Sequence, residues 1–451
     1  MDESRAPVHS QNALRSIERQ MMNKLRVLVL LGASTFAIAT GAAQTDSATA
    51  EHWVVTWATA EDMATTVPER PVLPPNVKMP DFQGSRGPRT PRPLPAVSDN
   101  QTVRMIVHTS IGGKKVRIEL QNAFDKQTVS VGSAHVAIHT TASSIDPQSD
   151  RQLTFSGSKS IDLQPGMIVL SDPVNLDLKP MSDVAVSLYI VKNQGTPTNH
   201  MPGLHTTYVS NGDRAAAASM PDSVTNTAYV WLKSVDVDAP AGSFAIACLG
   251  DSITDGFRTT VDANQAWPTL LAKRFSEKQG APIAVINEGI SGNQVLRDGA
   301  GVSALARFDR DVLTEPGVQW MVLLEGINDI NIHGQITGSG ALTADDLIQG
   351  YKQIIARAHM HHLKIVGATL TPDGGLWLAG PAGEATRQKV NDWIRTSGAF
   401  DAVVDFDAAI RDKTDSLRIR TEFDSGDHIH PNDPGNSAMA NAFDLSVFTR
   451  Q

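Results

Sequence analysis

An apolar–polar alternation of period two runs through the first half of the chain. It is clearest in residues 103–108, 116–121 and 184–190, and a turn at Gly112-Gly113 separates the first two segments. Alternation of this kind, punctuated by Gly, Pro, Asn and Asp, is typical of half-buried antiparallel strands. We therefore expect this half to form an antiparallel β-sandwich, and none of it has a convincing helical pattern.

The second half replaces this alternation with short apolar runs separated by helical patterns. The runs predict five buried strands, at Phe244–Leu249, Ile283–Ile286, Trp320–Leu324, Lys364–Leu370 and Ala402–Val404. The segments between them carry apolar residues at helical spacing, at Trp267–Lys278, Ser303–Leu313, Thr343–Leu363 and Glu384–Thr396. Alternating strands and helices predict a parallel sheet covered by helices on both faces, which is a three-layer α/β/α domain.

Two stretches rich in turn residues divide the chain. The first, VDAPAG at residues 237–242, separates the two patterns, so we place a β-sandwich domain at residues 50–238 and an α/β domain at residues 243–451. The second is a Pro-rich insertion at about residues 64–98, with nine prolines in residues 68–95. Proline disrupts both helices and sheets. We expect a surface loop, or a segment that folds over the neighbouring domain and shapes a substrate cleft.

The N-terminal residues 1–43 combine a polar extension, residues 1–20, with a following segment that has the pattern of an export signal. Lys24 and Arg26 form a basic start, residues 27–39 are mostly apolar, and small residues follow up to Ala43. The apolar run is shorter than the roughly 20 residues that span a membrane, so we expect no stable membrane anchor. The prediction is a periplasmic or secreted protein, cleaved near Ala43.

The net charge and the cysteine content of the chain limit the partners and the chemistry that we expect for the protein. The formal net charge is −9 and no block of Lys and Arg is present, which argues against a nucleic acid partner. Cys248 is the only cysteine, so the chain has no internal disulfide. Because Cys248 lies in a predicted buried strand, we interpret it as a small core side chain rather than a reactive thiol.

Polar residues follow the predicted strands at the point where each strand ends. Ser252 follows the first strand, Asn287–Asn293 the second and Glu325–Asp329 the third, and Asp427–Pro431, past the fifth strand, opens the last predicted helix. Sites in open α/β sheets lie beyond the carboxyl ends of the strands. We therefore expect a hydroxyl, a glycine-rich turn, a carboxamide and an Asp/His pair to meet at one edge of the sheet.

These four loops resemble the conserved blocks of the SGNH hydrolases, the GDSL-type esterases and lipases. The matching residues are GDSI with Ser252, GISGN with Gly292, GIND with Asn328, and DHIHP with Asp427 and His430. The resemblance implies a flavodoxin-like hydrolase domain of about five parallel strands. The first half is similar to the β-sandwich that precedes this domain in some exported bacterial GDSL esterases.

The resemblance implies a catalytic triad without a cofactor. Ser252 is the expected nucleophile, His430 the base that takes its proton, and Asp427 the carboxylate that orients the imidazole. The backbone N–H groups of Ser252 and Gly292 and the side-chain amide of Asn328 are the expected donors to the oxyanion. We expect Asp251, Asn293, Asp373 and Trp377 as candidates to line the substrate pocket.

Two other interpretations of these residues are less favourable. His428 competes with His430 as the base, but it directly follows Asp427 in the sequence, which makes a triad contact between their side chains awkward. The nucleophile elbow of the α/β-hydrolases requires a glycine two residues after the serine. In this sequence the residue two positions after Ser252 is Thr254, which argues against that fold.

A metal site is suggested only by a histidine cluster. His359, His361 and His362 lie at the end of a predicted helix, but their spacing does not put all three on one face, and no metal is expected.

The function expected from the sequence is a secreted serine esterase that acts on small-molecule or polysaccharide esters. An accessory β-sandwich, export and a polar composition favour short or acetyl groups, including groups linked to carbohydrate. The alternatives are a lipase, lysophospholipase or thioesterase of the same superfamily, and a carbohydrate-binding protein whose hydrolase half is inactive.

Overall fold

The computed structural model describes residues 51–61, 97–333 and 342–450. The predicted signal peptide and almost all of the Pro-rich insertion lie outside these described residues. Residues Glu51–Gln451 belong to one compact unit. Within it we refer to residues 51–61 and 97–238 as the β half, and to residues 244–450 as the α/β half. The chain passes from one to the other in residues 239–243, between β15 and β16.

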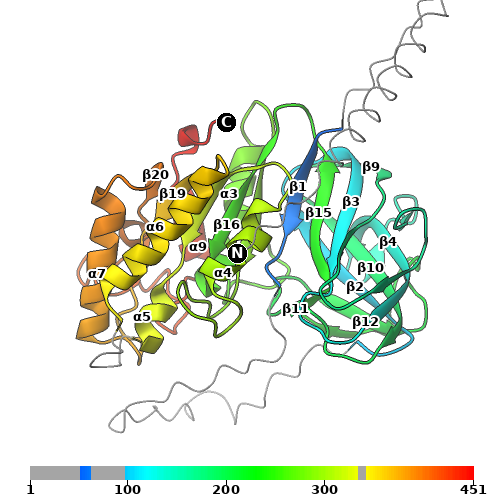
Figure 1. The fold of residues 1–451 in the computed structure, drawn as a ribbon, viewed down its shortest axis with the longest axis horizontal. Coiled ribbons are helices and arrows are strands. Elements are labelled where there is room, and N and C mark those ends of the chain that lie inside the picture. The colour runs from blue at the N-terminus through cyan, green and yellow to red at the C-terminus, as the bar shows by residue number, and fades with distance from the viewer. Residues whose placement is uncertain (1–50, 62–96, 334–341, 451) are drawn as a thin grey trace, which may run out of the picture. The chain divides into compact units, whose positions relative to one another are not determined.

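The β half contains two antiparallel sheets (Figure 1). The first has the order β1 (Trp53–Ala58), β15 (Leu232–Asp238), β3 (Gly113–Gln121) and β8 (Ile168–Leu170), with β9 (Val174–Leu178) also paired to β3. The second has the order β13 (Val224–Asn226), β12 (Thr207–Asn211), β2 (Gln101–Thr109), β10 (Ser182–Asn193), β4 (Val129–Thr141) and β5 (Ser144–Ile145), with β6 (Arg151–Leu153) and β7 (Ile161–Leu163) paired to β4. A short pair, β11 (Asn199–His200) and β14 (Tyr229–Val230), completes the half.

The predicted alternation is confirmed on β3 and is wrong on β2. On β3, Val116, Ile118 and Leu120 are buried in the core shared by both sheets. On β2 the polar position Arg104 is also fully buried. Its guanidinium donates to Ser187 Oγ and to the backbone carbonyls of residues 143, 215 and 217, so covering segments rather than solvent meet this face.

The α/β half is built on a parallel sheet of five strands. In spatial order these are β17 (Ile283–Gly289), β16 (Phe244–Gly250), β18 (Val318–Leu324), β19 (Lys364–Ala368) and β20 (Ala402–Val404). Numbered along the chain, this order is 2-1-3-4-5, the flavodoxin-like arrangement. Every residue of the inner strand β16, which pairs with β17 and β18, is buried, including Cys248, as its continuous apolar run predicts.

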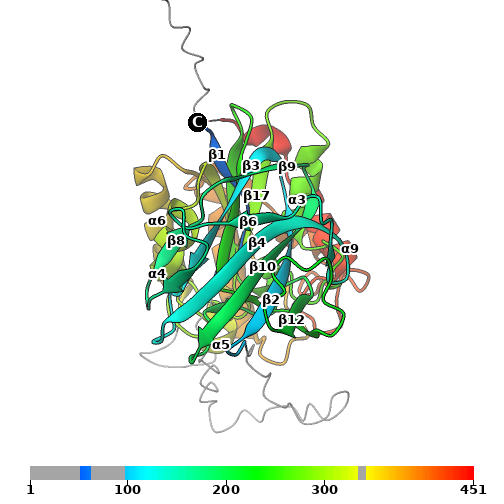
Figure 2. The same cartoon turned by 90° about the vertical axis from the view of Figure 1, so that its right-hand side faces the viewer.

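Helices cover both faces of this sheet. They are α2 (Ser252–Asp255), α3 (Trp267–Ser276), α4 (Ala304–Phe308), α5 (Ile327–His333), α6 (Ala344–Met360), α7 (Pro381–Thr396), α8 (Phe406–Ile410) and α9 (Asp433–Asn441). Figure 2 shows α4 and α6 on one side of the strands and α3 and α9 on the other. The helix expected over Ser303–Leu313 begins as α4 but continues as a π-helical turn, Asp309–Leu313. This turn carries the buried Asp311, which accepts from Arg307 Nη1 at 3.0 Å.

A buried ion cluster joins the two halves. Lys233 of β15 lies 2.8 and 2.9 Å from the two carboxylate oxygens of Glu288 on β17, and 3.0 Å from Glu315. All three side chains are almost fully buried. Burial raises the pKa of Glu288 to about 7, against the opposing effect of Lys233. Removing the lysine would leave buried carboxyl groups without their cation, so the cluster makes the contact between the halves specific.

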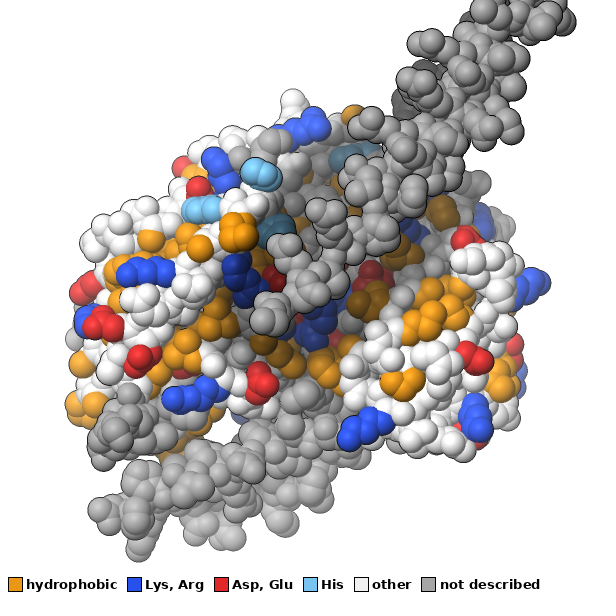
Figure 3. Space-filling model, in the orientation of Figure 1, with side chains coloured by type: hydrophobic (Ala, Val, Ile, Leu, Met, Phe, Trp, Pro, Cys, Tyr) orange, Lys and Arg blue, Asp and Glu red, His pale blue; other side chains and the backbone are white. Residues whose placement is uncertain are grey.

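The surface carries charge of both signs. Basic and acidic side chains are interspersed over the face seen in Figure 3. Among the described residues, no helix has the length and apolar character needed to cross a membrane.

Candidate active site

Ser252 lies on a sharp turn at the end of β16. It begins the four-residue helix α2, and the Asp251 side chain accepts from the backbone N–H of Ile253 at 2.9 Å. A Cβ atom at Gly250 would lie 2.2 Å from Thr254 Oγ1 and 2.4 Å from the carbonyl oxygen of Leu324. Only glycine therefore fits before the turn, and the strand can deliver Ser252 directly to the sheet edge.

His430 is in hydrogen-bond contact with this serine. Ser252 Oγ and His430 Nε2 are 2.8 Å apart, although 178 positions separate the two residues in the sequence. The ring of Phe257 packs edge-on against the imidazole, with centroids 4.8 Å apart. The imidazole is therefore held beside the hydroxyl by packing as well as by the hydrogen bond.

Asp427 occupies the other side of the imidazole. Its Oδ2 atom lies 2.8 Å from His430 Nδ1, and its Oδ1 atom accepts from the backbone N–H of His430 at 3.0 Å. Burial alone would raise the pKa of Asp427, but the hydrogen bond and charge of His430 outweigh it and hold this pKa well below its usual range. The carboxylate therefore stays ionised and orients the ring.

Arg258 is a further partner of Asp427 that the sequence analysis did not identify. Its Nε atom donates to Asp427 Oδ2 at 3.1 Å, and its guanidinium lies over the Phe257 ring. The motif offers no signal for this contact because Arg258 lies in a loop six residues after Ser252, far in sequence from Asp427.

His428 does not reach the serine in this arrangement. Its Nδ1 atom pairs instead with Asp424 Oδ2 at 2.7 Å, and its side chain is 44% exposed. The ring packs close to Gly375, in the loop after β19. The structure therefore brings His430, and not His428, into contact with Ser252.

The loop after β17 approaches the site with unusual backbone geometry. Gly292 has φ of +88°, and a Cβ atom there would lie 2.8 Å from the Ala300 Cβ. Asn328, on α5, donates from Nδ2 to the carbonyl oxygen of Asn293 at 2.9 Å. The amide of Asn328 thus connects the start of α5 to Asn293, the residue after Gly292.

Asp329 stabilises the chain just after Gly292 by hydrogen bonds to its backbone. Its carboxylate accepts from the backbone N–H groups of Val295 and Leu296 at 2.8 and 3.1 Å. Burial raises the pKa of Asp329 to about 6 despite these two donors. The GIND motif therefore supplies two residues, Asn328 and Asp329, that fix the position of the Gly292 loop.

A buried arginine, Arg307, connects the strand ends and was also missed from the sequence. Its guanidinium donates to the carbonyl oxygens of Gly250 and Glu288 at 2.9 and 2.7 Å, and to Asn293 Oδ1 at 2.9 Å. It is 1% exposed. Because the three acceptors belong to the ends of β16 and β17 and to the Gly292 loop, Arg307 sets their spacing.

The candidates for the substrate pocket are placed differently from one another. Asn293 is fully buried, and its amide bonds to the carbonyl oxygens of residues 300 and 302, so it supports the loop from inside the protein. Asp251 and Asp373 are also buried, and burial raises the pKa of Asp251 to about 7. Trp377 is half-buried in the loop after β19.

One member of the histidine cluster, His359, has an ordinary structural role. His359 Nε2 pairs with Asp401 at 2.9 Å, and Asp401 also accepts from the backbone N–H of Ile365. Within residues 51–61, 97–333 and 342–450, no group of three or more His, Cys, Asp or Glu side chains has the arrangement of a metal site.

The assembled geometry can activate a hydroxyl group. A serine bonded to an imidazole, whose other nitrogen faces an ionised carboxylate, can transfer its proton to that imidazole while it attacks an electrophile. The structure thus brings Ser252, His430 and Asp427 into one hydrogen-bonded chain, and brings Asn328 and Gly292 into one loop cluster.

Comparison with known proteins locates a family similarity in the α/β half. Residues 248–438 match the model of the GDSL-like Lipase/Acylhydrolase family. No curated protein matches the chain.

Several solved structures are similar to part of the chain. A carbohydrate acetylesterase family member from Sinorhizobium meliloti is 17% identical, with 44% of this chain and 94% of that chain covered and a TM-score of 0.36. A GDSL-like lipase from Bacteroides thetaiotaomicron VPI-5482 is 18% identical, with 45% and 87% covered and a TM-score of 0.34. The M. smegmatis aryl esterase is 18% identical, with 44% and 95% covered and a TM-score of 0.34.

Proposed function

Because residues 248–438 belong to the GDSL-like lipase/acylhydrolase family, the chain is an ester hydrolase of the SGNH superfamily, and we propose a mechanism for it on this premise. In this mechanism the protein cleaves carboxylic esters through a Ser-His-Asp triad. Ser252 is the nucleophile, His430 the general base and Asp427 the orienting carboxylate. The observation that carries the proposal is the pair of contacts made by His430, at 2.8 Å to Ser252 Oγ and 2.8 Å to Asp427 Oδ2.

In the acylation step, Ser252 Oγ bonds to the ester carbonyl carbon as its proton moves to His430 Nε2. The resulting oxyanion accepts hydrogen bonds from the backbone N–H groups of Ser252 and Gly292 and from the Asn328 amide. The carbon–oxygen bond to the alcohol then breaks, and the imidazolium returns its proton to the departing alkoxide. The products are the free alcohol and an acyl group on Ser252.

In the deacylation step, water takes the place of the alcohol. His430 accepts a proton from the water as its oxygen attacks the acyl carbon, and the proton returns to Ser252 Oγ as the acid leaves. Water is thus the only co-reactant, and the serine is regenerated.

The direct test is hydrolysis of p-nitrophenyl acetate by the wild-type protein beside Ser252→Ala. We expect the substitution to abolish turnover without changing the thermal unfolding temperature. Mass spectrometry of acid-quenched wild-type protein should find one acetyl group on the peptide that contains Ser252. Equal rates for the two proteins, or acetylation elsewhere, would reject the assignment.

For the substrate we propose short acyl groups, above all acetyl, on a polar alcohol such as a carbohydrate. The groups around His430 support this: Arg258 is 32% exposed, Asp427 25% and His428 44%. Such a rim suits a polar alcohol better than a lipid chain. The test is to compare kcat/KM for p-nitrophenyl esters of graded acyl-chain length and to measure acetate release from acetylated xylan. A preference for long acyl chains would instead favour a lipase, lysophospholipase or thioesterase.

We also propose export, from the basic start and apolar run in residues 24–43. Expression of the full chain in a bacterium, followed by N-terminal sequencing of the protein in periplasm and medium, tests it. Cleavage near Ala43 is expected, and an uncleaved protein confined to the cytoplasm would contradict it.

A further inference from the structure

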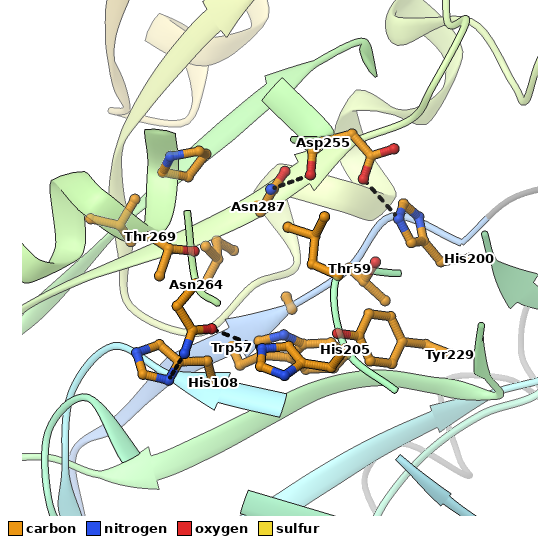
Figure 4. Close-up of a pocket in the computed structure, with 15 residues that line it drawn as sticks. Trp57, Thr59, His108, His200, His205, Tyr229, Asp255, Asn264, Thr269 and Asn287 are labelled. Atoms are coloured by element: carbon orange, nitrogen blue, oxygen red, sulfur yellow. Dashed lines mark hydrogen bonds and ion pairs between the residues drawn. The ribbon is translucent and has the colours of Figure 1, made fainter. Parts of the chain in front are cut away.

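A histidine of the β half reaches the turn that carries Ser252. His200, on β11, is 5% exposed, and its ring stacks on Tyr229 with centroids 6.3 Å apart. Its Nε2 atom lies 3.0 Å from Asp255 Oδ1, at the last residue of α2 (Figure 4). Both side chains are nearly removed from solvent, at 6% and 3% exposure.

The imidazole of His200 is held at both of its nitrogen atoms. Nδ1 lies 2.7 Å from the carbonyl oxygen of Ala60, which only accepts, so Nδ1 carries a hydrogen. Nε2 lies against Asp255 Oδ1, so both ring nitrogens have an oxygen partner and the buried carboxyl group of Asp255 has a partner in the β half.

Asp255 in turn connects two of the loops that form the site. Its Oδ2 atom accepts from the hydroxyl of Ser291, the residue before Gly292. Its backbone N–H donates to the carbonyl oxygen of Asp251 at 2.8 Å. A Cβ atom at Gly289 would lie 2.3 Å from the Asp255 nitrogen, so the two loops are in close contact at this point.

This contact lies in the wall of a small cavity between the two halves. The cavity, about 50 Å³, is lined by residues that include His200 and Asp255, but not by Ser252 or His430 (Figure 4). Pockets for small-molecule ligands are typically about 300–1,000 Å³. His200 therefore acts on the site through Asp255, and not by touching the substrate.

We propose that His200 is a positioning residue for ester hydrolysis. Through Asp255 and Ser291 it fixes the spacing between the backbone N–H groups of Ser252 and Gly292, the two oxyanion donors of the proposed function on which this inference rests. The β half is then a part of the catalytic apparatus, because the hydrolase loops are incompletely held without the histidine that it contributes.

The test compares His200→Leu with His200→Gln, whose amide can still donate to Asp255. Because small misplacements at a reacting centre are costly, we expect His200→Leu to lower kcat by roughly 10- to 100-fold with KM nearly unchanged. His200→Gln should recover most of that loss. A matched control is His135→Leu, since His135 is 8% exposed and its partner Asp150 belongs to the β half. This control should keep kcat.

A double-mutant cycle with Ser291→Ala separates positioning from general destabilisation. If His200 acts through Asp255 and Ser291, the two substitutions share one path, and the double variant should lose little more than His200→Leu alone. The proposal would be overturned if the fold-losses in kcat of the two single variants multiply in the double variant. It would also be overturned if His135→Leu loses as much kcat as His200→Leu.

Hydrogen exchange gives a readout that does not depend on ester hydrolysis. We expect faster amide exchange in residues 251–256 and 289–293 of His200→Leu, and unchanged exchange there in His135→Leu. Unchanged exchange in His200→Leu overturns the positioning role even if the protein is an esterase. If wild type and Ser252→Ala hydrolyse esters equally, the proposed function fails, and the exchange result still decides whether His200 holds the two loops.

Discussion

Replacing Asp427 by asparagine should switch the tautomer of the His430 imidazole, so that the ring hydrogen moves from Nδ1 to Nε2. The position of the ring should not change. The carboxylate accepts hydrogen bonds on both oxygens, from the backbone N–H of His430 at 3.0 Å on Oδ1, and from the ring at 2.8 Å and Arg258 at 3.1 Å on Oδ2. An amide has one accepting end only. The backbone donor cannot change, whereas the ring can exchange tautomers and the partly exposed Arg258 can move away. The amide nitrogen is therefore expected to face the ring.

The consequence for catalysis is a lost general base. With Nδ1 as an acceptor, the ring hydrogen lies on Nε2 and points at Ser252, so His430 cannot take the serine proton. The same substitution in a serine protease triad lowers kcat by roughly 10⁴-fold. At about 1.36 kcal/mol for each factor of ten, this is about 5.5 kcal/mol of transition-state stabilisation. KM should change little, because Asp427 does not contact the substrate in the proposed mechanism.

The assay is p-nitrophenyl acetate hydrolysis at neutral pH, with Ser252→Ala as the background. Asp424→Asn is a matched control: Asp424 accepts from the backbone N–H of His428 and pairs with its ring at 2.7 Å, in the same local pattern, but away from Ser252. It should retain wild-type turnover. An Asp427→Asn protein with more than about a tenth of wild-type kcat, far above the 10⁴-fold loss expected, would refute the reasoning.

Three further outcomes are expected. Asn328→Ala, which removes one proposed oxyanion donor and the hydrogen bond to the Gly292 loop, should lower kcat by roughly 10²- to 10³-fold with little change in KM; near-normal turnover would remove Asn328 from the site. Lys233→Met should lower the free energy of unfolding in urea by about 3–5 kcal/mol, since it leaves buried carboxyl groups unpaired, whereas Lys114→Met, at a pair 78% and 54% exposed, should change it by less than about 1 kcal/mol. Burial raises the pKa of Asp251 from 3.8 to about 7, so wild type loses stability as pH rises through this window. Asp251→Asn should therefore gain stability relative to wild type between pH 4 and pH 8, and a constant difference would contradict the buried proton.

Packing explains where the predicted alternation was right and where it was wrong. On β3 the apolar positions enter the core as expected, because one face of the strand is covered by the second sheet. On β2 the same alternation is present, yet Arg104 is buried beneath the segment that includes residues 214–217. Periodicity reports which residues tolerate water, and it cannot report that a distant segment with free carbonyl groups covers them.

The sequence by itself determined the order of elements in the α/β half and most of the residues that gather around Ser252. It could do so because parallel strands end at a common edge, so residues that follow successive strands converge whatever the rest of the chain does. The loops that carry Ser252, Gly292 and Asn328 meet for this reason, whereas His430 lies well beyond β20 and was predicted only from the resemblance of its motif to the family.

Only the tertiary structure decided what supports those residues. Arg258 on Asp427, Arg307 beneath the loops and His200 on Asp255 are single polar side chains in irregular or short elements, and their partners are 169, 57 and 55 positions away. A single polar residue leaves no periodic pattern. Its role comes from burial, which forces each polar group to find a partner among whatever the fold brings within reach.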